Sequence, residues 1–219
     1  LIVESFGSGI FETALRLRGY EQFLIDLTLS PGLAEAILEQ ILEVKLRYID
    51  LLNHNFKGKI HILREGDDLA TQQSLLISKE MYQRFIKPKH RQLFEYAKKS
   101  LGPSFYIFFH SCGAVYDLIP DFIEAGIDIL NPVQLSASKM NPEKLKRDFG
   151  KLITFWGGGV DTQGTLLRGS KDDVREEVKR NIETFAPGGG YVFAAVHNIQ
   201  DDIPVENLVV MWEAWKSKS

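Results

Sequence analysis

The amino-acid sequence predicts an α/β fold with a parallel sheet, and three observations support this prediction. Short apolar runs alternate with longer stretches of helical period along all 219 residues. The apolar runs are nearly continuous, as expected for strands that are buried on both faces of a parallel sheet. No low-complexity linker or shift in composition interrupts the alternation. We therefore expect residues 1–219 to form one domain in which strands and helices alternate.

Six runs are predicted to be strands. They are Leu1–Phe6, Lys59–Arg64, Phe105–His110, Asp128–Pro132, Leu152–Trp156 and Tyr191–Val196. This alternation occurs in doubly wound open sheets and in (β/α)8 barrels, and we expect the TIM-barrel type. A barrel has eight βα units and the sequence shows six, so we expect the first one or two units to be lacking. The start at Leu1, without an initiator methionine, agrees with that expectation.

The helices between these runs have recognisable beginnings and ends. Ser30-Pro31 begins a long helix with an apolar face, and Ser78 caps the next one. Gly126 and Gly150 follow helices and precede strands, which is the usual place of a C-terminal glycine. These capping residues therefore support the predicted order of strands and helices.

The composition narrows the class of protein. The chain is 44% hydrophobic and 25% charged, which is typical of a globular domain and not of a disordered chain. Its 26 Lys and Arg residues are outnumbered by 29 Asp and Glu residues and form no basic tract, so nucleic acid is not an expected partner. No apolar run approaches the roughly 18 residues of a membrane-spanning helix. The single cysteine, Cys112, suits the reducing cytoplasm.

Polar residues follow the carboxyl end of every predicted strand, which is the edge where α/β proteins build their active sites. These residues are Ser5, Glu65–Asp68, His110–Gly113, Asn131–Gln134, Gly157–Asp161 and His197–Gln200. The opposite strand ends carry ordinary turn residues. This asymmetry predicts an enzyme that acts on a small-molecule substrate at the carboxyl edge of the sheet.

His110 and Cys112 are the candidate metal ligands. They lie two residues apart at the end of a strand, so their side chains share a face and can reach one metal ion. Zn²⁺ accepts nitrogen and sulfur ligands in tetrahedral geometry, and His197 at another strand end is the candidate third ligand. The alternative is a small buried cysteine beside a hydrogen-bonded histidine, because a lone His-x-Cys pair is a weak motif.

Three carboxylates, Glu65, Asp67 and Asp68, lie within four residues. Glu65 and Asp67 are candidate catalytic groups, acting as a metal ligand, a general base or an acid of raised pKa. Asp68 is expected either to contact the substrate or to cap the segment that follows.

Four further residues at the strand ends are candidate substrate contacts. They are Asn131, Gln134, Gly158 and Asp161. The glycines around Gly158 allow backbone N–H groups to approach an anion closely, although a tight turn explains them equally well.

Several segments resemble a known family. They are Gly66-Asp67-Asp68 with Ser78 and Pro88 downstream, Phe109–Gly113, Glu124–Pro132, Phe155–Thr162, Gly188–Tyr191, and His197 through Pro204 to Glu206-Asn207. Together they resemble the uroporphyrinogen decarboxylase family of (β/α)8 barrels, which includes cobalamin-dependent zinc methyltransferases. The resemblance covers essentially the whole chain and implies that about the first third of a family member is lacking.

Within this family, we expect the chain to belong to the methyltransferase branch. In that branch a His-x-Cys pair and a later Cys bind zinc, which activates a nucleophile for methyl transfer to or from a corrinoid. His110 and Cys112 match the pair. The later Cys lies seven residues before a Pro-x-x-Asn, which here is the position of His197. The resemblance therefore implies zinc at His110, Cys112 and His197, and cobalamin on a partner protein.

Two alternatives remain open. Members of the decarboxylase branch act in porphyrin biosynthesis without metal or cofactor. As such a decarboxylase, this chain would use His197 and Asp67 on uroporphyrinogen or a related acidic tetrapyrrole. The other alternative is an incomplete chain that acts only with a partner chain. A barrel lacking two strands exposes two sheet edges, so a dimer or a partner chain is expected to complete it.

Overall fold

The computed structural model describes residues 1–102 and 104–218, and its centre is a six-stranded parallel sheet. The strands are β1 (Ile2–Glu4), β2 (Ile62–Gly66), β3 (Tyr106–His110), β4 (Ile129–Asn131), β5 (Thr154–Trp156) and β6 (Tyr191–Val192). They lie side by side in chain order, with β1 and β6 at the edges. A doubly wound sheet changes direction at a switch point, whereas a (β/α)8 barrel adds each strand beside the last. The strand order confirms the α/β prediction and follows the barrel pattern.

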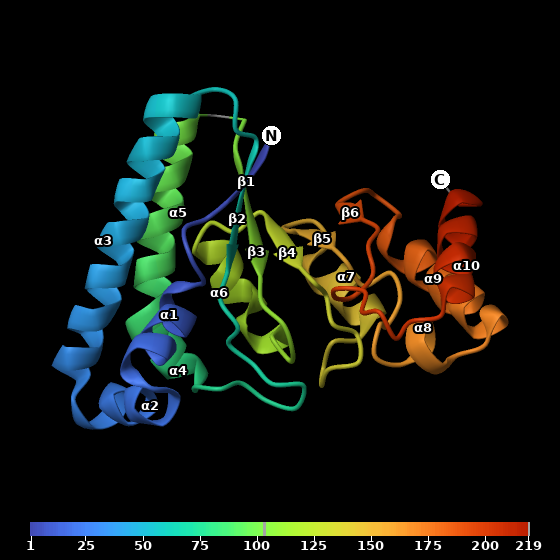
Figure 1. The fold of residues 1–219 in the computed structure, drawn as a ribbon, viewed down its shortest axis with the longest axis horizontal. Coiled ribbons are helices and arrows are strands. Elements are labelled where there is room, and N and C mark those ends of the chain that lie inside the picture. The colour runs from blue at the N-terminus through green and yellow to red at the C-terminus, as the bar shows by residue number, and fades with distance from the viewer. Residues whose placement is uncertain (103, 219) are drawn as a thin grey trace.

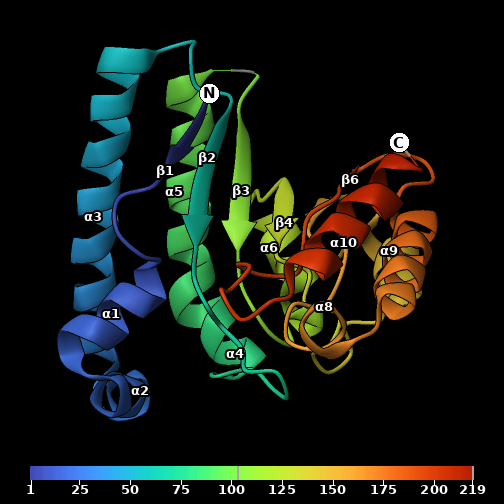
Figure 2. The same cartoon turned by 45° about the vertical axis from the view of Figure 1, so that its right-hand side comes forward.

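Helices connect the strands and flank the sheet (Figure 1). They are α1 (Ile10–Arg18), α2 (Tyr20–Leu29), α3 (Pro31–Phe56), α4 (Lys79–Met81), the π-helical turn Tyr82–Ile86, α5 (Lys87–Leu101), the 3-10 turn Tyr116–Leu118, α6 (Ile119–Glu124), α7 (Pro142–Phe149), α8 (Thr165–Arg168), α9 (Lys171–Phe185) and α10 (Val205–Lys216). The long helices α3 and α5 pack along each other next to β1–β3, and α9 and α10 pack together near β6 (Figures 1 and 2).

Two predicted helix starts are confirmed. Helix α3 begins at Pro31, directly after Ser30. The side chain of Ser78 accepts a hydrogen bond from the backbone N–H of Met81 at 3.2 Å and so caps α4. All six predicted strands are also present, although each is shorter than predicted, and β2 ends at Gly66 rather than Arg64.

The alternation of side chains along each strand decides which residues reach the carboxyl edge on the same side of the sheet. Phe109 is fully buried and packs against aromatic rings of α5 and α6. Its neighbour Phe108 faces the other way and packs edge-on against Trp156 of β5, with ring centroids 5.3 Å apart. Phe108 is in register with Arg64 of β2, and Gly66 is in register with His110. We call this second side the inner face, and the side on which Phe109 lies the outer face.

Two hydrophobic clusters hold these elements in place. The larger one joins the strands to α1–α7. The smaller one joins the loop after β5 to α8, α9 and α10. Among the described helices, none is both long enough and apolar enough to cross a lipid bilayer.

Candidate metal and substrate site

Three potential metal ligands meet at the carboxyl edge of the sheet. His110 ends β3, Cys112 follows two residues later, and His197 belongs to the loop after β6. One ligand atom from each lies within 4.8 Å of the other two. Cys112 Sγ is 3.2 Å from His110 Nε2, and the two imidazole rings are 5.8 Å apart. The structure therefore brings together the three residues that the sequence predicted as ligands, which we call the metal cluster.

A chain of hydrogen bonds orients the His110 ring. Asn131 Nδ2 donates to the backbone carbonyl of Trp156 at 2.8 Å, and this turns Asn131 Oδ1 towards His110 Nδ1 at 2.6 Å. An amide oxygen only accepts, so Nδ1 carries the proton and Nε2 keeps a lone pair facing Cys112. Burial lowers the pKa of His110, which favours the neutral ring. Metal-binding histidines are held by outer partners in this way.

Asp68 and Gly113 hold Cys112 in place. The backbone N–H of Cys112 donates to Asp68 Oδ1 at 2.8 Å. Gly113 has a φ of 87°, and a Cβ atom there would lie 2.4 Å from the carbonyl oxygen of Thr71, so the turn requires glycine. Burial and the nearby Asp68 carboxylate raise the pKa of the Cys112 thiol to about 12. A cation bound at the cluster would have to displace this proton.

Glu65 was predicted to be a catalytic group or metal ligand, but its side chain faces away from the metal cluster. Its side chain lies on the outer face of β2, where Lys45 Nζ lies 2.9 and 3.1 Å from the carboxylate oxygens. Ser5 Oγ donates to the same carboxylate at 2.6 Å. Burial raises the pKa of Glu65, and the Lys45 ammonium opposes that effect. Glu65 thus ties β1 and β2 to α3, because the residue alternation directs it away from His110.

The carboxylate of Asp67 is also bound by groups outside the metal cluster. It is fully buried, and its two oxygens each accept a backbone N–H of α1, from Phe11 and Glu12, at 2.8 Å. His90 Nε2 of α5 lies 3.0 Å from the same carboxylate. A carboxylate at a helix N-terminus pairs with the positive end of the helix dipole. Asp67 therefore anchors α1, which is a different role from the catalytic one predicted for it.

Gln134 and Gly158 have structural partners of their own. Gln134 is buried, and its Oε1 accepts the backbone N–H of Gly113 at 2.9 Å. The N–H of Gly158 donates to the carbonyl of Pro132, and the flanking glycines donate to the β6 segment. Their N–H groups are therefore already used within the fold. The tight turn, rather than anion binding, explains these glycines.

Two cavities meet at the metal cluster. The inner cavity has a volume of about 490 Å³ and lies against the inner face; its lining includes Arg64, Phe108, His110, Asn131, Pro132 and His197. The outer cavity has a volume of about 250 Å³; its lining includes Thr71, Cys112, Gly113, Gln134, Asp161 and His197. The cluster is therefore accessible from both cavities, and His197 borders each of them.

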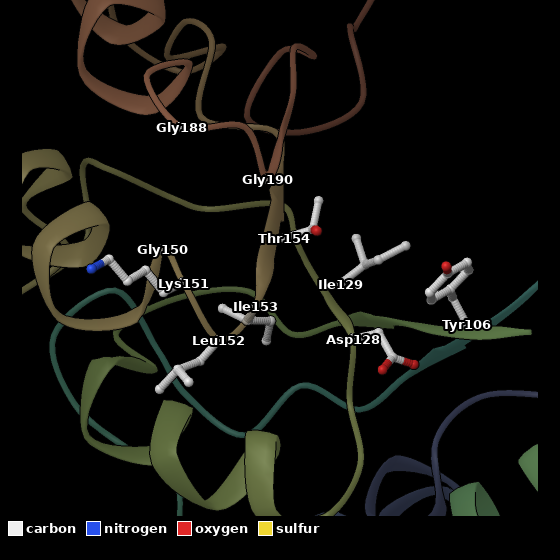
Figure 3. A pocket seen from close by; sticks show the side chains of 10 residues that line it. All are labelled: Tyr106, Asp128, Ile129, Gly150, Lys151, Leu152, Ile153, Thr154, Gly188 and Gly190. Carbon is white, nitrogen blue, oxygen red and sulfur yellow. The ribbon is translucent and has the colours of Figure 1, made fainter.

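A larger cavity, of about 670 Å³, lies at the opposite end of the sheet (Figure 3). It is formed by the segments where β3, β4 and β5 begin, with Tyr106, Ile129 and Thr154 on its wall. Its carboxylate, Asp128, already binds Lys98 and the backbone of β3. Among the described residues, no histidine or cysteine lines it. We therefore place the candidate site at the metal cluster and the two smaller cavities.

Arg64 is the residue of this site that sequence reasoning missed. The apolar run predicts a strand that ends at Arg64, which makes Glu65 the first residue beyond it. In the structure β2 continues to Gly66, and Arg64 lines the inner cavity two residues before that end. The available signal was the spacing of two between Arg64 and Gly66, which places both on one face.

The fold and the metal cluster define a protein with barrel-type strand order and a candidate metal site at its carboxyl edge. A model of the uroporphyrinogen decarboxylase family matches residues 2–218, and the chain therefore belongs to that family. A search of curated protein sequences found no match.

Solved structures agree with the fold. The chain is similar to a methyltransferase from Methanosarcina mazei, with a TM-score of 0.76 and 20% identity, over 99% of this chain and 58% of that one. It is also similar to a protein described as a vitamin-B12-independent methionine synthase from Listeria monocytogenes, with a TM-score of 0.50 and 11% identity. That match covers 100% of this chain and 64% of the other. The chain thus spans less than two thirds of either protein.

Proposed function

We propose that the protein is a zinc-dependent methyltransferase of the uroporphyrinogen decarboxylase family. It would transfer a methyl group between a small molecule and a corrinoid carried by a partner protein. One observation carries the proposal: ligand atoms of His110, Cys112 and His197 lie within 4.8 Å of one another at the carboxyl edge of the sheet. The methyltransferase from Methanosarcina mazei, which shares the fold, supports the same reaction class.

The residues of the cluster fit zinc. Two imidazoles and one thiolate are donors that Zn²⁺ prefers, and three protein ligands leave a fourth position open for a reactant. Zinc held by this set would supply Lewis acidity, which suits the activation of an ether or alcohol oxygen. Asn131 keeps His110 Nε2 free for the metal, and Asp68 fixes the backbone of Cys112.

The two cavities support a transfer between two reactants. His110 lines the inner cavity, Cys112 lines the outer one, and His197 lines both. A methyl donor and a methyl acceptor must both approach the reacting centre, and holding them in place removes much of the entropic barrier. We assign the small molecule to the inner cavity and the corrinoid to the outer side. Asp161, at the wall of the outer cavity, would contact the second reactant.

Decarboxylation of an acidic tetrapyrrole is the second candidate. It is supported by the family and by the cation Arg64 in the inner cavity, which His197 also lines. This reaction would not depend on zinc, so the two candidates differ in their response to metal removal.

A methyl-transfer assay with and without zinc tests the proposal. The purified protein is mixed with a methyl ether and free cob(I)alamin, whose absorption spectrum changes on methylation. We expect the activity to be lost with a chelator, restored by zinc, and absent in Cys112→Ser. Ser111→Ala is the matched control, because Ser111 is buried between the two ligands and its Oγ has no hydrogen-bond partner among the described residues. Equal activity of Cys112→Ser and Ser111→Ala would contradict the proposal.

A further inference from the structure

A chain of buried polar side chains connects α5 to the residue that follows β2. Its members are Tyr82 of the π-helical turn, His90 of α5 and Asp67, and each is fully buried. His90 Nε2 lies 3.0 Å from Asp67 Oδ2, and the Tyr82 hydroxyl lies 3.3 Å from His90 Nδ1. A carboxylate only accepts hydrogen bonds, so Nε2 carries a proton, and Nδ1 of the neutral ring accepts the hydroxyl proton of Tyr82. We call these three residues the buried chain.

The surroundings of His90 do not by themselves call for a histidine. Its ring packs edge-on against Phe109 of β3, with centroids 5.1 Å apart, and stacks on Phe94 of α5 at 5.6 Å. An apolar ring of similar size would fill this aromatic environment without any buried polar atom that needs a partner. The histidine is therefore explained by the hydrogen bonds at its two nitrogens.

Asp67 is the point at which α1 docks on the sheet. Its carboxylate accepts the N–H groups of Phe11 and Glu12, and His90 is the third donor. A Cβ atom on Gly9, directly before α1, would lie 2.3 Å from Asp67 Cγ, so only glycine lets the helix start come this close. Loss of the His90 donor would leave a buried carboxylate with one hydrogen bond fewer, which weakens the hold on α1.

The same segment also touches the metal cluster. The backbone N–H of Asp67 donates to the backbone carbonyl of His110 at 2.9 Å. The next residue, Asp68, accepts the backbone N–H of Cys112 at 2.8 Å. A shift of Asp67 would therefore displace hydrogen-bond partners of both metal-cluster residues that belong to the β3 segment. Helix α1, helix α5 and the metal cluster thus meet at the dipeptide Asp67-Asp68.

We infer that His90 is a positioning residue for the metal cluster: by holding Asp67, it couples the docking of α1 to the geometry of His110 and Cys112. The inference deepens the proposed function and rests on the metal cluster described there. Coupling between two sites is reciprocal, so a metal ion at the cluster also stabilises the docked position of α1.

The metal-free protein provides the first test. Cys112 is the single cysteine of the chain, so alkylation by iodoacetamide, followed by mass spectrometry, reports on its turn alone. His90→Phe keeps an aromatic ring and loses both hydrogen bonds. We expect alkylation to become roughly 2- to 10-fold faster in this variant, the factor that corresponds to one lost hydrogen bond. Hydrogen exchange at the amides of Phe11 and Glu12, measured by NMR, should accelerate by a similar factor.

Leu93→Ala is the matched control, because Leu93 is buried in the same helix and lies outside the buried chain. This variant should destabilise the protein in urea and leave alkylation of Cys112 near the wild-type rate. His90→Gln keeps a donor for Asp67 and should recover much of the wild-type behaviour, and Tyr82→Phe should have a smaller effect than His90→Phe. Equal acceleration in His90→Phe and Leu93→Ala, or wild-type rates in His90→Phe, would overturn the inference.

Zinc binding by the same variants separates this inference from the proposed function. We expect zinc to slow exchange at Phe11 and Glu12 in the wild type, and His90→Phe to bind zinc roughly 10-fold more weakly, as for loss of an outer partner of a metal ligand. A wild type that binds no zinc, together with faster alkylation and exchange in His90→Phe, supports the coupling and contradicts the proposed reaction. A wild type that binds zinc, with affinity, alkylation and exchange all unchanged in His90→Phe, overturns the inference and leaves methyl transfer standing.

Discussion

Asn131→Leu tests how the fold prepares His110 for a metal ion. In the wild type, Asn131 accepts the His110 Nδ1 proton at 2.6 Å and donates to the Trp156 carbonyl at 2.8 Å. Leucine removes both hydrogen bonds while keeping a side chain of similar size. The ring of His110 then loses the partner that sets its tautomer, so its Nε2 lone pair is no longer directed at Cys112.

The expected loss follows from the two hydrogen bonds. Each contributes about 0.5–1.5 kcal/mol of net stability, so Asn131→Leu should lower the free energy of unfolding by roughly 1–3 kcal/mol. Loss of an outer partner of a metal-binding histidine lowers metal affinity about 10- to 100-fold, which corresponds to about 1.4–2.8 kcal/mol. Asn131→Asp should keep most of the affinity for zinc, because a carboxylate also accepts the Nδ1 proton.

Competition with a chromogenic chelator measures zinc affinity, and urea unfolding measures the stability of the same variants. The reasoning would be refuted if Asn131→Leu lost stability but bound zinc as tightly as the wild type. In that case the Asn131 contact would hold the strand ends together without orienting the ligand.

Two further predictions concern the framework of the site. Lys45→Met leaves the fully buried Glu65 carboxylate without its cation, and should lower the free energy of unfolding by about 3–5 kcal/mol in urea; adding Glu65→Leu should recover most of the loss. A loss below about 1 kcal/mol would show that the pair is dispensable. Burial alone would raise the pKa of Asp121, but hydrogen bonds from Lys87 and its neighbours hold that pKa below the usual value. The stability from Asp121 is therefore present above its unfolded pKa of about 3.9 and is lost as the pH falls through the folded pKa. The difference in unfolding free energy between wild type and Asp121→Asn should shrink between pH 7 and about pH 3, and a difference independent of pH would contradict this account.

Much of the fold could be predicted because each element carries a local signal. The apolar runs mark the strands, and Ser30 and Ser78 mark helix starts. The convergence of His110, Cys112 and His197 could also be predicted, because the carboxyl ends of all strands in a parallel sheet lie at the same edge. The strands were predicted too long because the apolar runs continue beyond the paired residues, into the segments on either side.

The orientation of Glu65 could not be predicted, because Arg64 and Glu65 place a charged residue on each face of β2, and the sequence does not show which of the two is buried. Its partner did leave a signal. Lys45 interrupts the apolar face of α3 between Leu42 and Ile49, and a buried lysine requires an acid nearby. The partners of Gly158 lie on distant loops, which no local pattern reveals.

The zinc content of the purified protein tests the central claim most directly. Elemental analysis should find close to one zinc ion per chain in the wild type and in Ser111→Ala, and almost none in Cys112→Ser. Zinc missing from the wild type even after dialysis against the metal, or retained equally by Cys112→Ser, would contradict a metal site at His110, Cys112 and His197.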